Sequence, residues 1–418
     1  MQAAPFPTRR LKYASTINDE ALTEATDSDF ELAYIDIGNV DSQGRVHDIV
    51  NYRFEDAPSR ARRIVRDGDV IISTVRTYLQ AIAPVESPPE NLIVSTGFAV
   101  VRPSNLLDHR FCKYAVRANR FLWEVESRST GVSYPAINAS DLGDIQVSLP
   151  EIGDQRLIGN YLDRETARID GLIAEKERML ALLEEKRTAL ISRVVTRGLD
   201  PNAPLKPSGQ EWLGEIPAHW GQPRAKGLFR EVDRRTETGA ETLLSLRMGK
   251  GLVPHHDVSE KLLEASDVTG FKKIEPGQMV INRMRAASGL IAVATESGLV
   301  SPDYAVFDIV DQDLSIEYFL ELFKTSLLQA VFRSASKGLG TGEQGFFPRL
   351  YTDAFLSLHF PYPPTVEQAR LIVLFIEQQC SEMLHMESLL RLSINLAKER
   401  RAALITAAVT GHGPCWRR

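Results

Sequence analysis

The sequence predicts a mixed α/β chain in which two globular domains of similar fold are joined by two long antiparallel coiled-coil helices. Three observations predict it: the second half of the chain repeats the first, each half opens with short β-like runs between turn residues, and each half ends in a proline-free stretch with seven-residue apolar spacing. The length of 418 residues suits two or three domains, and 43% hydrophobic with 25% charged residues is typical of a folded protein. The duplication predicts a pseudo-twofold molecule.

The repeat is visible as matched segments about 210 residues apart, too long a period for a solenoid. "GDVIISTVR" (68–76) recurs as "GQMVINRMR" (277–285), and "VSTGFAVV" (94–101) recurs as "VSPDYAVF" (300–307). Near the end of each half, "KRTALISRVVT" (186–196) recurs as "RRAALITAAVT" (400–410). The two halves are therefore expected to share one fold.

Each half begins with a globular part, residues 1–150 in the first and 199–360 in the second. The runs 69–75, 99–102, 279–282 and 305–310 are predicted strands, and 109–125 and 316–332 are predicted helices. Mixed strands and helices with Gly and Pro between them predict a compact α/β core in each half.

Each half ends in a predicted long helix, residues 151–198 in the first and 361–418, with a C-terminal tail, in the second. Prolines flank both helical stretches, and each would extend over about 40 residues, roughly 60 Å. Apolar residues recur every seven positions in both, with Lys176 as the exception: Leu162, Ile169, Leu183 and Leu190, then Ile376, Met383, Leu390, Ala397 and Leu404. These recurring apolar residues form a seam along one side of each helix. Because a seam of this kind must be buried, we expect the two helices to pack on each other.

Several function classes are excluded by composition and by missing motifs. The net charge of −6 means that any nucleic-acid site is a local patch, with partner subunits neutralising the remaining phosphates. Three cysteines, no secretory signal and no apolar run of transmembrane length predict a cytoplasmic protein. Gly249-Lys250 is followed by Gly251, so it is not a Walker A motif, and neither metal-ligand spacing nor a methyltransferase motif occurs. The domains are therefore expected to bind rather than catalyse.

The segment "EEKRTALISRVVTRGLDPNAPLKPSGQEWLGEIPAHW" (184–220) resembles the central conserved region of the specificity subunit of type I restriction–modification enzymes. "FPYPPTVEQ" (360–368), "RLIVLFIEQQ" (370–379) and "LAKERRAALITAAVTG" (396–411) resemble the distal conserved region. "GDVIISTVR" and "STGFAVVRP" resemble core strands of the target recognition domains. The resemblance covers nearly the whole chain, although the first domain starts at "FPTRRLKYAS" (6–15) without a "GEIPAHW"-like lead.

The resemblance implies a non-catalytic DNA-binding subunit. Residues 1–150 and 199–360 would be target recognition domains, each reading one half of a bipartite asymmetric site on double-stranded DNA. The central and distal helices would set the spacing and dock two methylation subunits. Those subunits would bind S-adenosylmethionine and flip the target adenine, and a restriction subunit, a motor and nuclease, would use ATP and Mg. No cofactor, metal or membrane is implied for this chain.

DNA contacts call for cationic, amide and hydroxyl side chains on loops. The basic run beginning at Arg60, the ends of two predicted strands, and the loop 127–134 with its longer counterpart 334–346 meet this requirement. The candidates are Arg60, Arg62, Arg63, Arg76, Thr77, Tyr78, Arg128, Ser129, Thr130, Ser133, Arg283, Arg285, Lys337, Thr341 and Gln344.

Two other functions fit the same sequence. One is a scaffold or inhibitor that binds methyltransferase subunits without reading DNA, and the other is an enzyme with an unrecognised site. Protection of one bipartite sequence by the chain and its partners would favour the DNA reader. Methyl transfer or cleavage by the chain alone would favour the enzyme.

Overall fold

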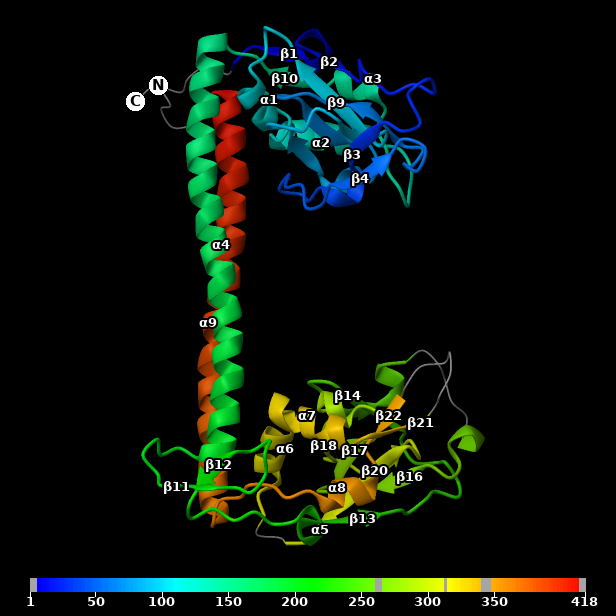
Figure 1. Ribbon diagram of the computed structural model, residues 1–418, viewed down its shortest axis with the longest axis vertical. Helices are drawn as coiled ribbons and strands as arrows, with labels where there is room; N and C mark the ends of the chain where they lie inside the picture. Colours follow the sequence, from blue (N-terminus) through cyan, green and yellow to red (C-terminus); the bar gives the residue numbers. More distant parts are fainter. Residues whose placement is uncertain (1–5, 260–264, 312–313, 340–346, 413–418) are drawn as a thin grey trace. The chain divides into compact units, whose positions relative to one another are not determined.

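A computed structural model describes residues 6–259, 265–311, 314–339 and 347–412 (Figure 1). It divides into two compact units, unit 1 (Met1–Arg178 with Leu390–Arg418) and unit 2 (Met179–Leu389). We call residues 6–151 the first head and the described residues of 198–365 the second head. Each unit combines one head with part of both long helices. The predicted mixed α/β class, with two similar domains and two long antiparallel helices, is confirmed.

The first head contains two four-stranded sheets. One is antiparallel and has the order β2 (Ser15–Ile17), β9 (Phe98–Pro103), β6 (Val70–Ser73), β7 (Ile82–Pro84). The other has the order β4 (Val50–Arg53), β3 (Glu31–Ile35), β8 (Leu92–Ser95), β5 (Ala61–Ile64), with β3 parallel to β8. A separate pair joins β1 (Thr8–Arg10) to β10 (Gln146–Ser148).

Strand β6 is a continuous apolar run because both of its faces are buried. Val70 and Ile72 pack into the core formed with the helices of the head, and Ile71 packs into the core formed with the second sheet. All three side chains are at most 1% exposed. Alternate residues of a strand point to opposite faces, so these three residues supply two cores.

The second head repeats the antiparallel sheet in the same order. Its strands are β13 (Phe229–Val232), β20 (Tyr304–Ile309), β17 (Met279–Asn282) and β18 (Ile291–Val293). The second sheet is split into two pairs, β14 (Leu244–Arg247) with β15 (Gly251–Pro254), and β16 (Lys272–Ile274) with β19 (Gly298–Val300). A single parallel bridge between Leu243 and Leu299 remains where the first head has the β3–β8 ladder.

Two further strand pairs in the second head are β11 (Leu205–Pro207) with β12 (Glu215–Pro217), and β21 (Lys337–Leu339) with β22 (Phe347–Arg349). The remaining short elements are α3 (Ala139–Gly143), α5 (Ala225–Leu228), α8 (Thr352–Ser357), and the 3-10 turns η1 (Leu11–Tyr13), η2 (Ile37–Asn39), η3 (Thr77–Leu79), η4 (His255–Asp257), η5 (Ala265–Val268) and η6 (Ala286–Ser288).

Each helix predicted within a head is in fact a pair of helices. The first head has α1 (His109–Ala115) and α2 (Asn119–Arg128), and the second has α6 (Ile316–Lys324) and α7 (Ser326–Ala335). Thr325 ends α6 and caps α7, since its side chain accepts a hydrogen bond from the backbone N–H of Leu328. Neither break contains Gly or Pro, so the sequence carried no strong signal for it.

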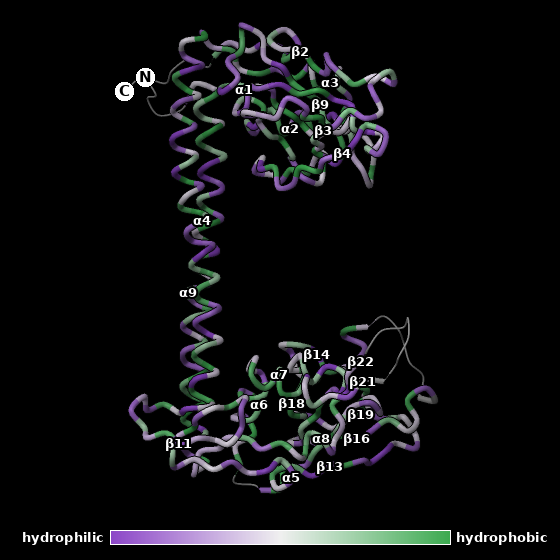
Figure 2. Tube along the Cα trace, viewed as in Figure 1, coloured by the Kyte–Doolittle hydropathy of each residue, from purple (hydrophilic) through white to green (hydrophobic). Residues whose placement is uncertain are grey.

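The long helices are α4 (Ile152–Arg197) and α9 (Val366–Thr410), close to the predicted limits. In unit 1 they run antiparallel, because Asp170 pairs with Arg401 and Glu177 with Lys398. The predicted seam positions Leu162, Ile169, Ile376 and Met383 are buried. Hydrophobic and hydrophilic residues alternate along both helices (Figure 2). In the described part of the chain, no helix is long and apolar enough to cross a membrane.

Candidate nucleic-acid interface

Two candidate arginines lie just beyond the end of a central strand, one in each head. Arg76 follows β6 and precedes η3, and Arg285 follows β17 and precedes η6. Both side chains are exposed. Arg76 has a left-handed backbone with φ of 54°, and its guanidinium carbon lies 4.8 Å from the ring centroid of Tyr134. An exposed guanidinium can offer paired donors to guanine or to phosphate.

The residues after Arg76 have different roles. Tyr78 is exposed, at 54%, and stays available to a ligand. Thr77 is buried, and its hydroxyl lies 2.8 Å from the hydroxyl of Ser129. The Ser129 hydroxyl donates to the Val125 carbonyl, so it accepts the hydrogen bond from Thr77. Thr77 and Ser129 were both predicted to contact DNA, but the structure places their hydroxyls inside the head, where they join the turn to α2.

The loop after α2 is exposed at its tip. Ser133 and Thr130 face solvent, and a backbone bridge to Ala136 closes the loop. Arg128 is still in α2 and pairs with Glu124, with Nη2 at 2.6 Å from Oε2. Val132 is fully exposed, and the sequence analysis did not include this apolar tip residue.

The basic run of the first head lies on and beside strand β5. Arg60 is exposed just before the strand. Arg62 stacks over the Phe54 ring at 4.7 Å, and the buried Nε of Arg63 has no hydrogen-bond acceptor. Arg60 is therefore the member of this run that is most open to a phosphate, while Arg62 and Arg63 are half-buried against the sheet.

Arg283 belongs to the interior of the second head. Its Nη2 lies 2.6 Å from Glu231 Oε1 and 3.0 Å from Thr352 Oγ1, and the side chain is 22% exposed. The side chain of Lys272 is 2% exposed, and its Nζ lies 3.8 Å from Glu231 Oε1. Burial and the nearby Arg283 lower the pKa of Lys272. The guanidinium of Arg283 thus takes part in an internal ion-pair network, and its predicted DNA contact stays a prediction.

The counterpart loop of the second head is only partly described. Lys337 is exposed at the start of β21. Thr341 and Gln344 lie outside the described residues, so their predicted contacts stay predictions.

The hairpin tip between β14 and β15 is a surface that the sequence analysis missed. Arg247, Met248 and Lys250 are all exposed there, Met248 at 61%. Gly249 and Lys250 at this tip belong to the Gly-Lys-Gly sequence that does not fit a Walker A motif. The available signal was two basic residues around a glycine turn between short apolar runs.

The described residues contain no cluster of three or more His, Cys, Asp or Glu side chains that could hold a metal ion. Burial raises the pKa of the Cys112 thiol to about 12, which keeps it protonated and unreactive.

Comparison with known proteins gives the family context. No family model matches the chain. The EcoKI specificity subunit of Escherichia coli K12 is 22% identical over 288 residues, 65% of this chain and 59% of that protein. The EcoDI specificity subunit of E. coli is 23% identical over 291 residues, 64% of this chain and 62% of that protein. The matches therefore span less than two thirds of these relatives.

Solved structures match over nearly the full length. A chain from a study of complex assembly and conformational transition of the type I restriction–modification system has a TM-score of 0.74 at 19% identity, with 99% of both chains covered. The HsdS subunit from Thermoanaerobacter tengcongensis has a TM-score of 0.55 at 20% identity, with 97% of both covered. The predicted resemblance to type I specificity subunits is confirmed, and the chain has the fold of these structures.

Proposed function

We propose that this chain is the DNA-recognition subunit of a type I restriction–modification complex and has no catalytic activity of its own. One observation carries the proposal: both heads build the same four-stranded sheet order and place an exposed arginine, Arg76 or Arg285, at the same point after its central strand. Two equivalent heads with equivalent cations fit a DNA site with two half-sites. The names of the relatives, which are specificity subunits, support the same role.

The long helices suit the docking of methylation subunits. Apolar side chains outside the helix seam remain about half exposed in both units. In unit 1 they are Leu157, Leu172, Leu392 and Leu396, and in unit 2 they are Met179, Leu182, Leu371, Leu374, Leu384 and Leu389. Apolar surface of this extent on a helix pair is the kind that a partner helix covers. In this proposal two methylation subunits bind there and supply S-adenosylmethionine, and the helix length fixes the gap between half-sites.

The test is to express the chain with the methylation subunits of its host in cells that lack other adenine methylation. We expect methylated adenines in one bipartite motif, and none when the chain is omitted. The exchange of Leu392 and Leu396 for Asp should abolish methylation by preventing assembly. Assembly without any defined methylated or protected sequence would instead support the scaffold function, and methylation by the chain alone would support an enzyme.

A further inference from the structure

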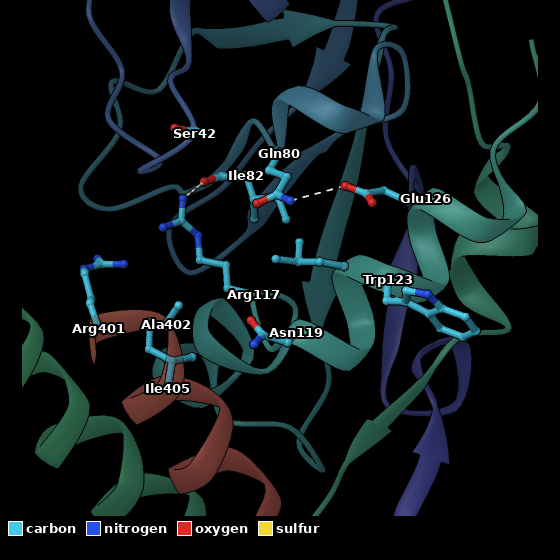
Figure 3. Close-up of a pocket in the computed structure, with 11 residues that line it drawn as sticks. Ser42, Gln80, Ile82, Arg117, Asn119, Trp123, Glu126, Arg401, Ala402 and Ile405 are labelled. Carbon is cyan, nitrogen blue, oxygen red and sulfur yellow. Dashed lines mark hydrogen bonds between the residues drawn. The ribbon is translucent and has the colours of Figure 1, made fainter. Parts of the chain in front are cut away.

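A cavity of about 310 Å³ lies in unit 1 between the first head and α9 (Figure 3). Its walls come from α2, from the segment around Ile82, and from α9 through Arg401 and Ile405. Figure 3 shows the side chains of Arg117 and Arg401 on the same side of this cavity, with Trp123 at the opposite rim. None of these residues was among the predicted DNA contacts.

Arg117 brings a poorly compensated positive charge to the cavity. Its guanidinium donates to the backbone carbonyls of Gln43 and Ile82, and it packs directly against Gly44. Among the described residues, no carboxylate lies within ion-pair distance of it. Burial and the like charge of Arg401 lower the pKa of Arg117 to about 10. A half-buried cation without a counter-ion gains stability from an incoming anion.

Arg401 is only partly neutralised. Its Nε lies 2.9 Å from Asp170 Oδ1, but this buried Nε has no acceptor in hydrogen-bonding geometry. The acid that lines the cavity, Glu126, accepts a hydrogen bond from Gln80 at 3.3 Å, and Figure 3 shows it on the side away from Arg401. The two guanidiniums therefore keep donors for a further acceptor.

The internal repeat provides a comparison from within the molecule. By the matched helices and the 186–196 repeat, Arg117 corresponds to Lys324 and Arg401 to Arg187. In unit 2 each of these cations has its own carboxylate, Lys324 with Glu321 at 2.6 Å and Arg187 with Glu184 at 2.8 Å.

In unit 1 the positions of those two carboxylates are occupied by Tyr114 and Lys398. Trp123, which is 67% exposed, likewise stands where unit 2 has Ala330. In unit 2 both cations therefore have a carboxylate partner, whereas in unit 1 Arg401 pairs with Asp170 and Arg117 has no carboxylate partner among the described residues. The difference at Arg117 leaves unit 1 with one more uncompensated positive charge at this position than unit 2 has.

We propose that this cavity of unit 1 binds an acidic side chain of a protein partner, whose carboxylate contacts Arg117 and Arg401 while an adjacent apolar residue packs against Trp123. The cavity is lined by polar side chains together with Ile82, Ile405 and Trp123, a mixture that fits the carboxylate and the apolar stem of Glu better than a DNA phosphate, which projects from a charged sugar chain. Trp and Arg are the residues that most often dominate protein interfaces. The site rests on the proposed role as an assembly subunit, and it makes the two units unequal toward protein partners.

The test uses the full chain labelled with 5-fluorotryptophan, which gives one ¹⁹F NMR signal for each of the four tryptophans. The Trp123→Phe variant assigns the signal of Trp123. The probes are acetyl-Leu-Glu-Leu-amide, its Gln isostere, inorganic phosphate, and a short DNA duplex. We expect the Glu peptide to shift the Trp123 signal saturably and the Gln peptide to bind at least tenfold more weakly.

Matched variants locate the effect. Arg401→Gln should weaken binding of the Glu peptide at least tenfold, whereas Arg187→Gln, at the corresponding position of unit 2, should leave it unchanged. Asp170→Asn should preserve or tighten binding, because it removes the carboxylate that pairs with Arg401. Melting temperatures identify any variant that fails to fold, and the comparison of Glu with Gln peptide on the unaltered chain needs no variant.

Equal binding of the Glu and Gln peptides, or no saturable shift with either, would overturn the proposal. A Trp123 shift caused by duplex DNA and lost in Arg401→Gln would replace it with a phosphate site. DNA affinity of the assembled methylation complex is measured in parallel and should not change in Arg401→Gln. A complex that binds no specific DNA would contradict the proposed function without affecting the peptide result.

Discussion

The two heads share one strand order but differ in the polar pair that borders it. In the first head Asp69, 1% exposed, accepts two hydrogen bonds from Arg102 at 3.0 and 2.8 Å. At the matched positions of the second head, Gln278 donates to Asp308 at 2.8 Å. A buried ion pair has thus been exchanged for an amide–carboxylate pair with no change in sheet order. The fold is fixed by the alternating apolar faces, and the polar partners only need to satisfy each other.

The interiors differ as well. Phe229, Phe319 and Phe323 belong to a group of contacting rings in the second head, with Phe229 and Phe319 centroids 5.5 Å apart. The position matched to Phe319 in the first head is Cys112, and both side chains are fully buried. The two side chains are equally buried, but Phe is much larger than Cys. The stability of the second head therefore depends more on individual aromatic contacts.

The largest expected effect tests this difference in packing. Phe319→Ala should destabilise the second head by about 3–5 kcal/mol, because it opens a large cavity among rings. Cys112→Ala should cost the first head about 1 kcal/mol, because it removes a single buried atom. Peptide-level hydrogen exchange of β17 and β6 measures each head separately. Similar losses of stability in the two heads would show that the aromatic cluster does not make the second head more sensitive to a core substitution.

The next effect concerns the polar pairs. Arg102→Met should destabilise the first head by about 3 kcal/mol, because it leaves the buried Asp69 carboxylate without its main partner. Asp308→Met should cost the second head only about 1 kcal/mol, because it leaves a neutral amide unsatisfied. Peptide-level hydrogen exchange of β6 and β17 again measures the loss of stability in each head. Equal costs would mean that the ion pair and the amide pair are equivalent in strength.

A smaller effect is expected on DNA binding. Arg76→Ala and Arg285→Ala should each weaken binding of the assembled complex by about 1–3 kcal/mol if they read a base, and relax specificity at one position. If they hold a phosphate, the loss should be uniform and the salt slope should fall by about one. Arg283→Ala is the control and should lower stability, because Arg283 pairs internally with Glu231. Unchanged affinity at every salt concentration, with normal melting, would remove Arg76 and Arg285 from the interface.

The smallest effect is a pH dependence that Asp308 gives to the stability of the second head. The hydrogen bond from Gln278, followed by the interaction with Arg230, lowers the pKa of Asp308 below its usual 3.8. A carboxyl group whose pKa is lowered in the folded state stabilises the fold fully at pH values above its unfolded pKa. This stabilisation is lost as the pH falls through the folded-state pKa. The stability difference between the unaltered chain and Asp308→Asn should therefore shrink between pH 5 and pH 3. A constant difference over this range would show that the charge of the Asp308 carboxylate does not contribute to the stability of the head.

Periodicity and repetition were sufficient to predict the fold class. The proline-free heptad runs located α4 and α9, and the matched segments located β6 and β17. The break at Thr325 was not predictable, since a threonine inside an apolar helical pattern is also an ordinary helix residue. Only tertiary contacts decide that it acts as a cap.

The candidate site was harder to predict, because the type of a residue does not show whether its side chain points into the head or toward solvent. Arg76, Arg283 and Arg285 look alike in sequence, yet Arg283 pairs with Glu231, which lies far away along the chain. Thr77 and Ser129 likewise turn inward to each other. The two arginines of the cavity were not predicted to act together, because Arg117 lies beside α2, Arg401 lies on α9, and nothing in the sequence brings them together.

The central claim, that each head reads its own half-site, is tested most directly by exchanging one head. Residues 1–150 are replaced by the corresponding domain of another specificity subunit, and the methylated motif is read from the DNA of cells that express the hybrid with methylation subunits. The account predicts that one half-site changes while the other half-site and the gap stay the same. A change in both half-sites, or in neither, would contradict it.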